Sequence, residues 1–68
     1  MDKQKREWMR KVGIQKLPKP VVINGKEFQY FTVYPDGTEM YFSQEYLERT
    51  PLEQLKKAAS RYGVAADG

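Results

Sequence analysis

The chain contains no cysteine and no histidine among its 68 residues. It therefore lacks the thiolates and imidazoles that bind structural zinc, and the cysteine pairs that cross-link small secreted domains. A core of this size rarely contributes more than roughly 3–5 kcal/mol of net stability, and without cross-links or metal the fold depends on packing alone or on a partner. We expect a cytoplasmic protein with no metal and no other cofactor.

Several other features are also missing. No apolar run approaches the roughly 20 residues of a transmembrane helix, so we expect no membrane association. There is no histidine for acid–base chemistry near neutral pH, no cysteine nucleophile and no glycine-rich phosphate loop. Ser43 and Ser60 have no base beside them, and Glu45 and Glu48 form a one-turn pair on a predicted short helix. We therefore expect that the chain is not an enzyme.

The charges that are present are unevenly distributed along the chain. Residues 1–20 carry +5, residues 21–50 carry −3 and residues 51–68 carry +1, within a net charge of +3. A basic arm on an acidic body is typical of proteins that bind a polyanion or an acidic protein surface. The alternative is that the basic residues form an ordinary solvated helix face.

The first predicted element is an amphipathic helix from about Asp2 to Val12, ended by Gly13. At 100° per residue its apolar side consists of Trp8, Met9 and Val12. The candidate polyanion-binding residues on and beside its opposite side are Lys3, Arg6, Arg10 and Lys11. Cations near a helix N-terminus oppose the helix dipole, which favours an anionic partner that would order this segment.

Residues 14–20 form a predicted extended connector, because Pro18 and Pro20 disfavour helix. Residues 21–42 then predict an antiparallel meander of three strands. Asn24-Gly25 between two β-prone runs indicates a type I′ hairpin. The sequence from Tyr34 to Thr38 indicates a three-residue loop in which Gly37 adopts a positive φ.

These turns fix the strand register and so assign side chains to two faces. The predicted core face carries Val21, Ile23, Phe28, Tyr30, Thr32, Tyr34, Met40 and Phe42. The second face is mixed and has an apolar patch of Phe31, Val33 and Tyr41 at its centre. We expect the helix that carries Trp8 and Val12 to cover this patch; if left open, the patch would bind a ligand.

The C-terminal third predicts two helices within residues 43–63. Ser43 can cap a short helix that ends at Arg49, and Thr50-Pro51-Leu52-Glu53 has the pattern of a capping box. Gly63 would end the second helix in the left-handed conformation. Residues 64–68 are expected to form a flexible tail. The fold class is therefore α+β, with the helices packed on the sheet of one small domain.

A three-stranded sheet backed by a C-terminal helix loosely resembles the sheet-reading DNA modules of phage integrases. Glu27 and Glu39 stand on the second face, where such a module would need basic and polar residues to contact phosphate. In size and tyrosine content the chain is also similar to the small accessory inhibitors of phages and other mobile elements. That likeness implies a regulator or inhibitor that docks on another protein.

Two functions therefore remain. The preferred one is a non-catalytic protein-binding module that uses Phe31, Val33 and Tyr41, or the edge strand from Val21 to Ile23, because aromatic residues are common interface anchors. The alternative is nucleic-acid binding through the basic N-terminal helix. An uncovered edge strand and patch would also permit a homodimer.

Overall fold

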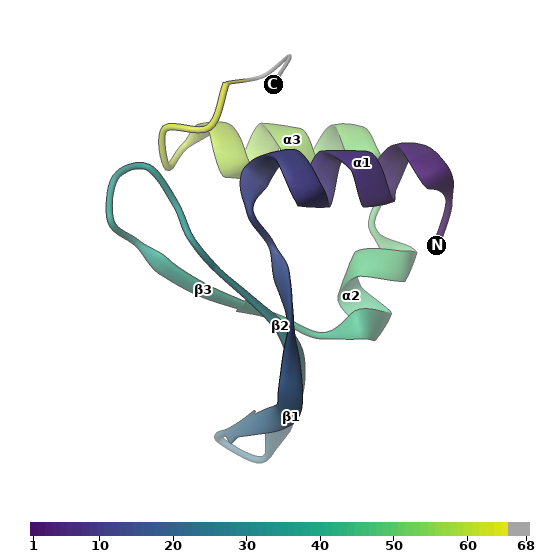
Figure 1. Cartoon of the computed structure of the whole chain (residues 1–68), viewed down its shortest axis with the longest axis vertical. Helices are drawn as coiled ribbons and strands as arrows, with labels where there is room; N and C mark the ends of the chain where they lie inside the picture. The colour runs from purple at the N-terminus through teal and green to yellow at the C-terminus, as the bar shows by residue number, and fades with distance from the viewer. Residues whose placement is uncertain (66–68) are drawn as a thin grey trace.

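Residues 1–65, which the computed structural model describes, form three helices and three strands (Figure 1). In chain order these are α1 (Lys3–Val12), β1 (Gln15–Ile23), β2 (Lys26–Val33), β3 (Glu39–Phe42), α2 (Gln44–Arg49) and α3 (Leu52–Ser60). The strands form one antiparallel sheet in the order β1-β2-β3. The α+β class predicted from the sequence is confirmed.

Both ends of α1 follow from single residues. The Asp2 carboxylate accepts a hydrogen bond from the backbone N–H of Lys5 at 2.8 Å, which satisfies one of the free donors of the first turn. Gly13 ends the helix with φ of +88°, a left-handed conformation that glycine adopts without strain. The predicted helix is confirmed to within one residue.

The two turns of the sheet also match their sequence signals. Asn24 and Gly25 have φ of 52° and 78°, as a type I′ turn requires, and Ile23 pairs with Lys26. In the second loop the N–H of Tyr34 donates to the carbonyl of Thr38 at 2.9 Å. Short-range turn chemistry therefore sets the register of β2 with β3 and that of the outer half of the β1–β2 hairpin.

The predicted connector at residues 14–20 is wrong for most of its length, because β1 begins at Gln15. Lys16 pairs with Tyr30 and Val21 pairs with Phe28, so residues 17–20 bulge opposite Gln29 alone. Pro18 and Pro20 fall in this bulge of the edge strand β1. Proline has no backbone N–H to donate, and the sheet needs no hydrogen bond from these two positions.

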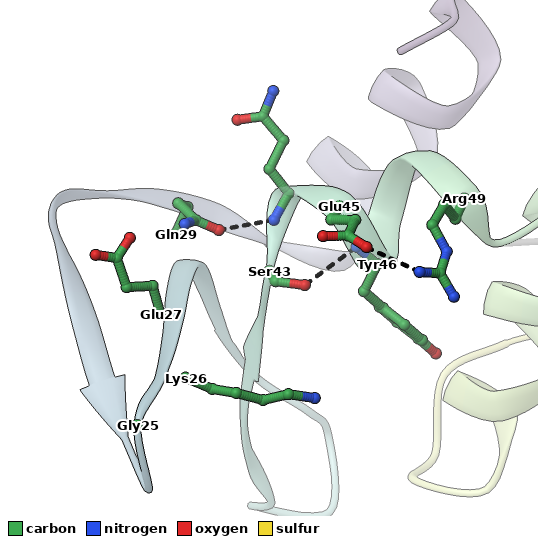
Figure 2. Close-up of a pocket in the computed structure, with 9 residues that line it drawn as sticks. Gly25, Lys26, Glu27, Gln29, Ser43, Glu45, Tyr46 and Arg49 are labelled. Carbon is green, nitrogen blue, oxygen red and sulfur yellow. Dashed lines mark hydrogen bonds and ion pairs between the residues drawn. The ribbon is translucent and has the colours of Figure 1, made fainter.

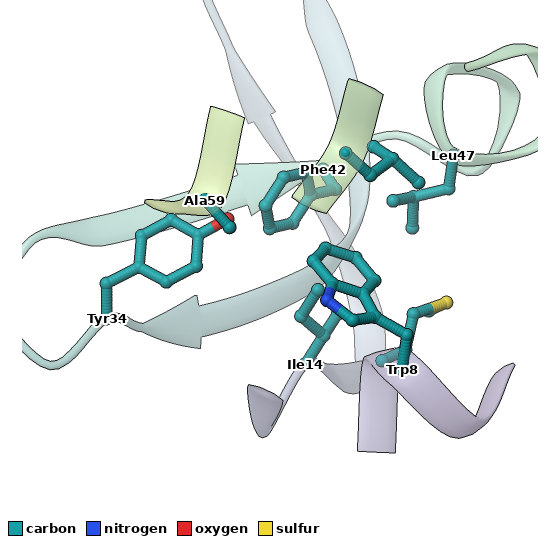
Figure 3. Close-up of a cluster of buried hydrophobic side chains, with 8 residues drawn as sticks. Trp8, Ile14, Tyr34, Phe42, Leu47 and Ala59 are labelled. Carbon is teal, nitrogen blue, oxygen red and sulfur yellow. The ribbon is translucent and has the colours of Figure 1, made fainter. Parts of the chain in front are cut away.

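The hydrophobic core lies between the helices and one face of the sheet (Figure 3). It comprises Trp8, Met9, Ile14, Tyr34, Phe42, Leu47, Leu55 and Ala59. Five predicted core-face residues lie on this side, either buried or packed against the cluster: Tyr30, Thr32, Tyr34, Met40 and Phe42. Each helix contributes to the cluster, which explains how so short a chain holds together without cross-links.

Two expectations about the sheet faces are corrected. The Trp8 side of α1 packs into this core and not over Phe31, Val33 and Tyr41, because Trp8 joins Leu47 and Leu55 in the same cluster. Val21, Ile23 and Phe28 also lie outside the core cluster. Since β3 ends at Phe42, opposite Tyr30, the outer half of the β1–β2 hairpin extends away from the helices (Figure 1).

The C-terminal region differs from its sequence pattern in two details. Ser43 caps α2 by accepting a bond from Tyr46 N–H at 3.1 Å, as predicted. The predicted capping box is not formed, because α3 starts after Pro51 with no side-chain cap, and Thr50 belongs to the end of α2. Gly63 has the expected positive φ but does not end the helix, because α3 ends at Ser60 with Arg61 as its C-cap.

The predicted flexible tail is wrong at Val64. Val64 is half-buried and packs against the core, and its N–H donates to the carbonyl of Ala59 at 3.4 Å. Residues 66–68 of the predicted tail lie outside the described part of the chain.

Within the described part, no helix has the length and apolar character needed to cross a membrane.

Candidate functional site

The three residues of the predicted apolar patch lie together on the sheet face that the helices leave open. Phe31 and Tyr41 are a cross-strand pair whose ring centroids are 5.0 Å apart at 45°. Val33 is two residues further along β2, on the same side by strand alternation, and its side chain is 53% exposed. We call Phe31, Val33 and Tyr41 the aromatic face.

The aromatic face has additional neighbours that the strand pattern did not assign to it. The ring of Phe28 lies 6.3 Å from that of Tyr41, so three aromatic rings form one cluster. Val33 pairs with Glu39 and Phe31 pairs with Gln15, which places an acidic and a neutral side chain beside the patch. Further along the sheet, Val22 is 62% exposed.

This arrangement has the composition of a protein-binding surface. Interface centres are enriched in tyrosine and phenylalanine and depleted in charge, and their rims are polar. Aromatic rings also lose little conformational entropy when a partner covers them. An apolar ligand could also cover such a face.

The basic residues of α1 form a separate surface. Lys3, Arg6 and Arg10 line a shallow hollow of about 250 Å³, and Glu7 lies in the same hollow. Lys11 is exposed but does not line it. The structure therefore brings together three of the four candidate polyanion-binding residues, with one carboxylate among them that would weaken the attraction for phosphate.

Arg6 also borders a second hollow, of about 410 Å³, that the sequence did not indicate. Lys16 from β1 and the half-buried ring of Tyr30 from β2 line this hollow together with Met9 and Glu48. Lys16 and Tyr30 are far from Arg6 in sequence, and only the packing of α1 against the sheet brings them close. No sequence signal indicated this hollow, because the register of the Asn24-Gly25 turn would place Lys16 opposite Val33 and only the bulge at residues 17–20 shifts it to Tyr30.

Lys5 does not belong to the basic surface, although the sequence places it between Lys3 and Arg6. Its side chain is buried, and its ammonium nitrogen donates to the carbonyl oxygens of Leu47 and Thr50, each at 2.7 Å. A third carbonyl, that of Glu48, lies at 3.4 Å. The role of Lys5 is thus to hold α1 against the C-terminus of α2.

A hollow of about 510 Å³ lies between the tip of the β1–β2 hairpin and α2 (Figure 2). Its polar groups are used locally. Gln29 Oε1 accepts from the N–H of Gln44 at 2.7 Å, and Arg49 pairs with Glu45 at 2.8 Å across one exposed helical turn. Ser43 Oγ is the helix cap, so this hollow contains no activated nucleophile.

Tyr34 is the titratable group that the fold perturbs most clearly. Burial, and to a smaller extent repulsion from the neighbouring Tyr46 and Tyr62 hydroxyls, raises the pKa of its hydroxyl to about 12. The Tyr34 ring stacks on that of Tyr62 with centroids 5.2 Å apart. The Tyr34 hydroxyl therefore stays protonated over the neutral pH range.

Comparisons of the chain with protein-family models, with curated proteins and with solved structures give no match.

Proposed function

We propose that the chain is a small non-catalytic module of the cytoplasm that binds a partner protein through the aromatic face. The observation that carries this proposal is the placement of all three helices on the opposite side of the sheet, which among the described residues leaves Val33 53% exposed and Phe31 and Tyr41 half-buried. A domain this small has little apolar surface to spare, and an open aromatic cluster is typical of an interaction site.

The chemistry of the face further supports a protein partner over a nucleic acid. Glu39 stands beside Val33, and its carboxylate would repel phosphate. A protein surface with an apolar centre and a basic rim would instead complement both features. A module that covers such a surface on a larger protein would act as a regulator or inhibitor of it.

Site-specific photo-crosslinking in the cells that express the chain tests this proposal. A benzophenone amino acid at position 33 should give a covalent protein adduct that survives nuclease treatment. The same group at Glu53, which is exposed on α3, is the matched control and should give none of that adduct. Equal labelling from both positions, or adducts that nuclease removes, would contradict the proposal.

With the captured partner in hand, two sets of substitutions separate the surfaces. Phe31→Ala combined with Tyr41→Ala should cost at least about 2 kcal/mol of binding free energy, since central aromatic anchors dominate interfaces. Charge reversal of Arg6 and Arg10 should mainly slow association. Both variants must keep a cooperative unfolding transition, which the single tryptophan, Trp8, reports by its fluorescence.

Nucleic-acid binding through α1 is the second candidate function, favoured by the common hollow of Lys3, Arg6 and Arg10. If this function is correct, the Arg6/Arg10 variant should bind more weakly than the Phe31/Tyr41 variant. The Arg6/Arg10 variant should lose affinity for nucleic acid and flatten the slope of log affinity against log salt, whereas the aromatic variant should retain both.

A further inference from the structure

β3 is an edge strand, and within residues 1–65 no strand pairs with its outward backbone groups. The hydrogen bond from Tyr34 N–H to the Thr38 carbonyl determines which residue pairs between β2 and β3 are hydrogen-bonded. Because bonded and non-bonded pairs alternate in an antiparallel ladder, Met40 turns its backbone groups toward β2, and Glu39 and Tyr41 turn theirs outward. The edge thus presents two residues with free donors and acceptors.

An apolar hollow of about 210 Å³ runs beside this edge. Phe28, Met40, Phe42 and Tyr46 supply its apolar lining. The Tyr46 ring stacks on Phe42, with centroids 6.2 Å apart, and yet remains 44% exposed. A strand added to β3 would cover these rings while it paired with the free backbone groups.

The charges along the edge indicate which strand fits. Glu39 lies at the end of β3 next to the Tyr34–Thr38 loop, and Lys26 lines the hollow at the opposite end, beside Ser43. A second β3 that runs antiparallel about a two-fold axis at Tyr41 would bring each Glu39 to the Ser43 end of the other copy, near its Lys26. Glu39 would therefore face the opposite charge of Lys26 across the axis, at an end of the edge where Glu27, Glu45 and Arg49 also lie.

We propose that β3 pairs antiparallel with β3 of a second copy, about a two-fold axis at Tyr41, to form a symmetric dimer with one six-stranded sheet. Such an isologous contact is the commonest form of homodimer. Because β3 has only four residues, the contact is small and the dimer is weak. The pairing does not rest on the proposed function, although it would join the two aromatic faces into one surface.

Sedimentation equilibrium at low salt tests the charge complementarity, with total concentrations from about 10 µM to 1 mM to cover a weak interface. Four samples are compared: the natural chain, Glu39→Lys, Lys26→Glu, and an equimolar mixture of these two variants. Each single variant places like charges together at both ends of the pair, and the association constant should fall at least about tenfold. In the mixture every contact again joins opposite charges, so association should return to the natural level.

The matched control is Glu53→Lys, which makes the same change of charge on the exposed surface of α3 and should associate like the natural chain. A natural chain that stays monomeric throughout would overturn the proposal. So would single variants that associate normally, or a mixture that does not recover.

The absence of cysteine permits an independent test of the geometry. Residues at a two-fold axis between bonded antiparallel strands have Cα atoms about 5.5 Å apart, within the range that a disulfide spans. Tyr41→Cys should therefore oxidise to a covalent dimer at least about tenfold faster than Val22→Cys, which is exposed on β1. Equal rates would show that β3 does not pair in this way.

Discussion

The side-chain nitrogen of Lys5 lies 2.7 Å from the carbonyl oxygen of Leu47, and so joins the first turn of α1 to the last turn of α2. Leu47 is fully buried, and its carbonyl is one of the helix-end acceptors that have no partner within α2. The ammonium of Lys5, a residue of α1, thus caps the C-terminus of α2. This contact explains a cation whose position near the start of α1 is otherwise unfavourable.

Replacement of Lys5 tests this structural role. Lys5→Met keeps the length of the side chain but leaves the carbonyls of Leu47 and Thr50 without their donor. We expect the free energy of unfolding to fall by about 2–3 kcal/mol, because the lost hydrogen bonds involve a charged donor and a buried site. Lys3→Met is the matched control on an exposed residue of the same helix and should change stability by less than about 0.5 kcal/mol. Equal losses in urea titrations would contradict the cap.

The raised pKa of Tyr34 predicts a loss of stability at alkaline pH. Its pKa rises from the ordinary value of 10.0 to about 12 in the folded chain, so the folded state retains a proton that the unfolded state releases. The associated stability is complete below pH 10 and is lost as the pH rises from 10 through 12, by about 2–3 kcal/mol in total. Urea titrations should therefore show a falling midpoint in this window.

Tyr34→Phe isolates the contribution of that hydroxyl. The variant keeps the stacking on Tyr62 and the buried ring, so its stability near neutral pH should stay close to that of the natural chain. Above pH 10 its midpoint should fall less steeply. An unchanged alkaline slope would assign the loss to other groups.

Leu55 and Phe28 should differ in their effect on stability, although the sequence pattern assigned both to the core. Leu55 is 2% exposed within the core cluster, so Leu55→Ala should cost about 2–5 kcal/mol and unfold much of the population. Phe28 lies outside that cluster in the outer hairpin, and Phe28→Ala should cost about 1 kcal/mol. A larger loss at Phe28 than at Leu55, measured by thermal unfolding, would contradict this placement of the core.

Gly37 tests the second loop of the sheet. Its φ is +90°, and apart from its two chain neighbours no described residue has a heavy atom within 4 Å of the position that a Cβ would occupy. The cost of a side chain there is therefore backbone strain alone, about 1–3 kcal/mol for Gly37→Val. Gly37→Asn should cost less, because asparagine tolerates a positive φ. Melting temperatures that do not follow this order would mean that the loop has another conformation.

The sequence predicts the local structure of this chain well. Asp2, Gly13, the Asn24-Gly25 turn and the Tyr34–Thr38 loop each act through their nearest neighbours, and each has its predicted role. From these turns follows the register that unites Phe31 with Tyr41. Signals of this kind depend on backbone geometry over four or five residues and need no knowledge of the tertiary packing.

The sequence does not predict which face of the sheet α1 covers. Both faces of the sheet carry apolar residues, so hydropathy alone does not determine on which face Trp8 packs. The choice depends on Leu47 and Leu55, which lie more than 30 residues away and form a pocket for Trp8 only after α2 and α3 have packed. The role of Lys5 was missed for the same reason, since its partners lie across the chain in α2.

The central claim is that the helices cover the Thr32 side of β2 and leave its Val33 side open. Because the chain has no cysteine, Thr32→Cys and Val33→Cys each introduce a single thiol at adjacent positions that are 3% and 53% exposed in the natural chain. The rate of thiol labelling under native conditions tests the claim directly. We predict that the thiol at position 33 reacts almost as fast as in the unfolded chain, and that the thiol at position 32 is protected until the domain opens. Protection of both thiols, or of position 33 alone, would contradict the claim.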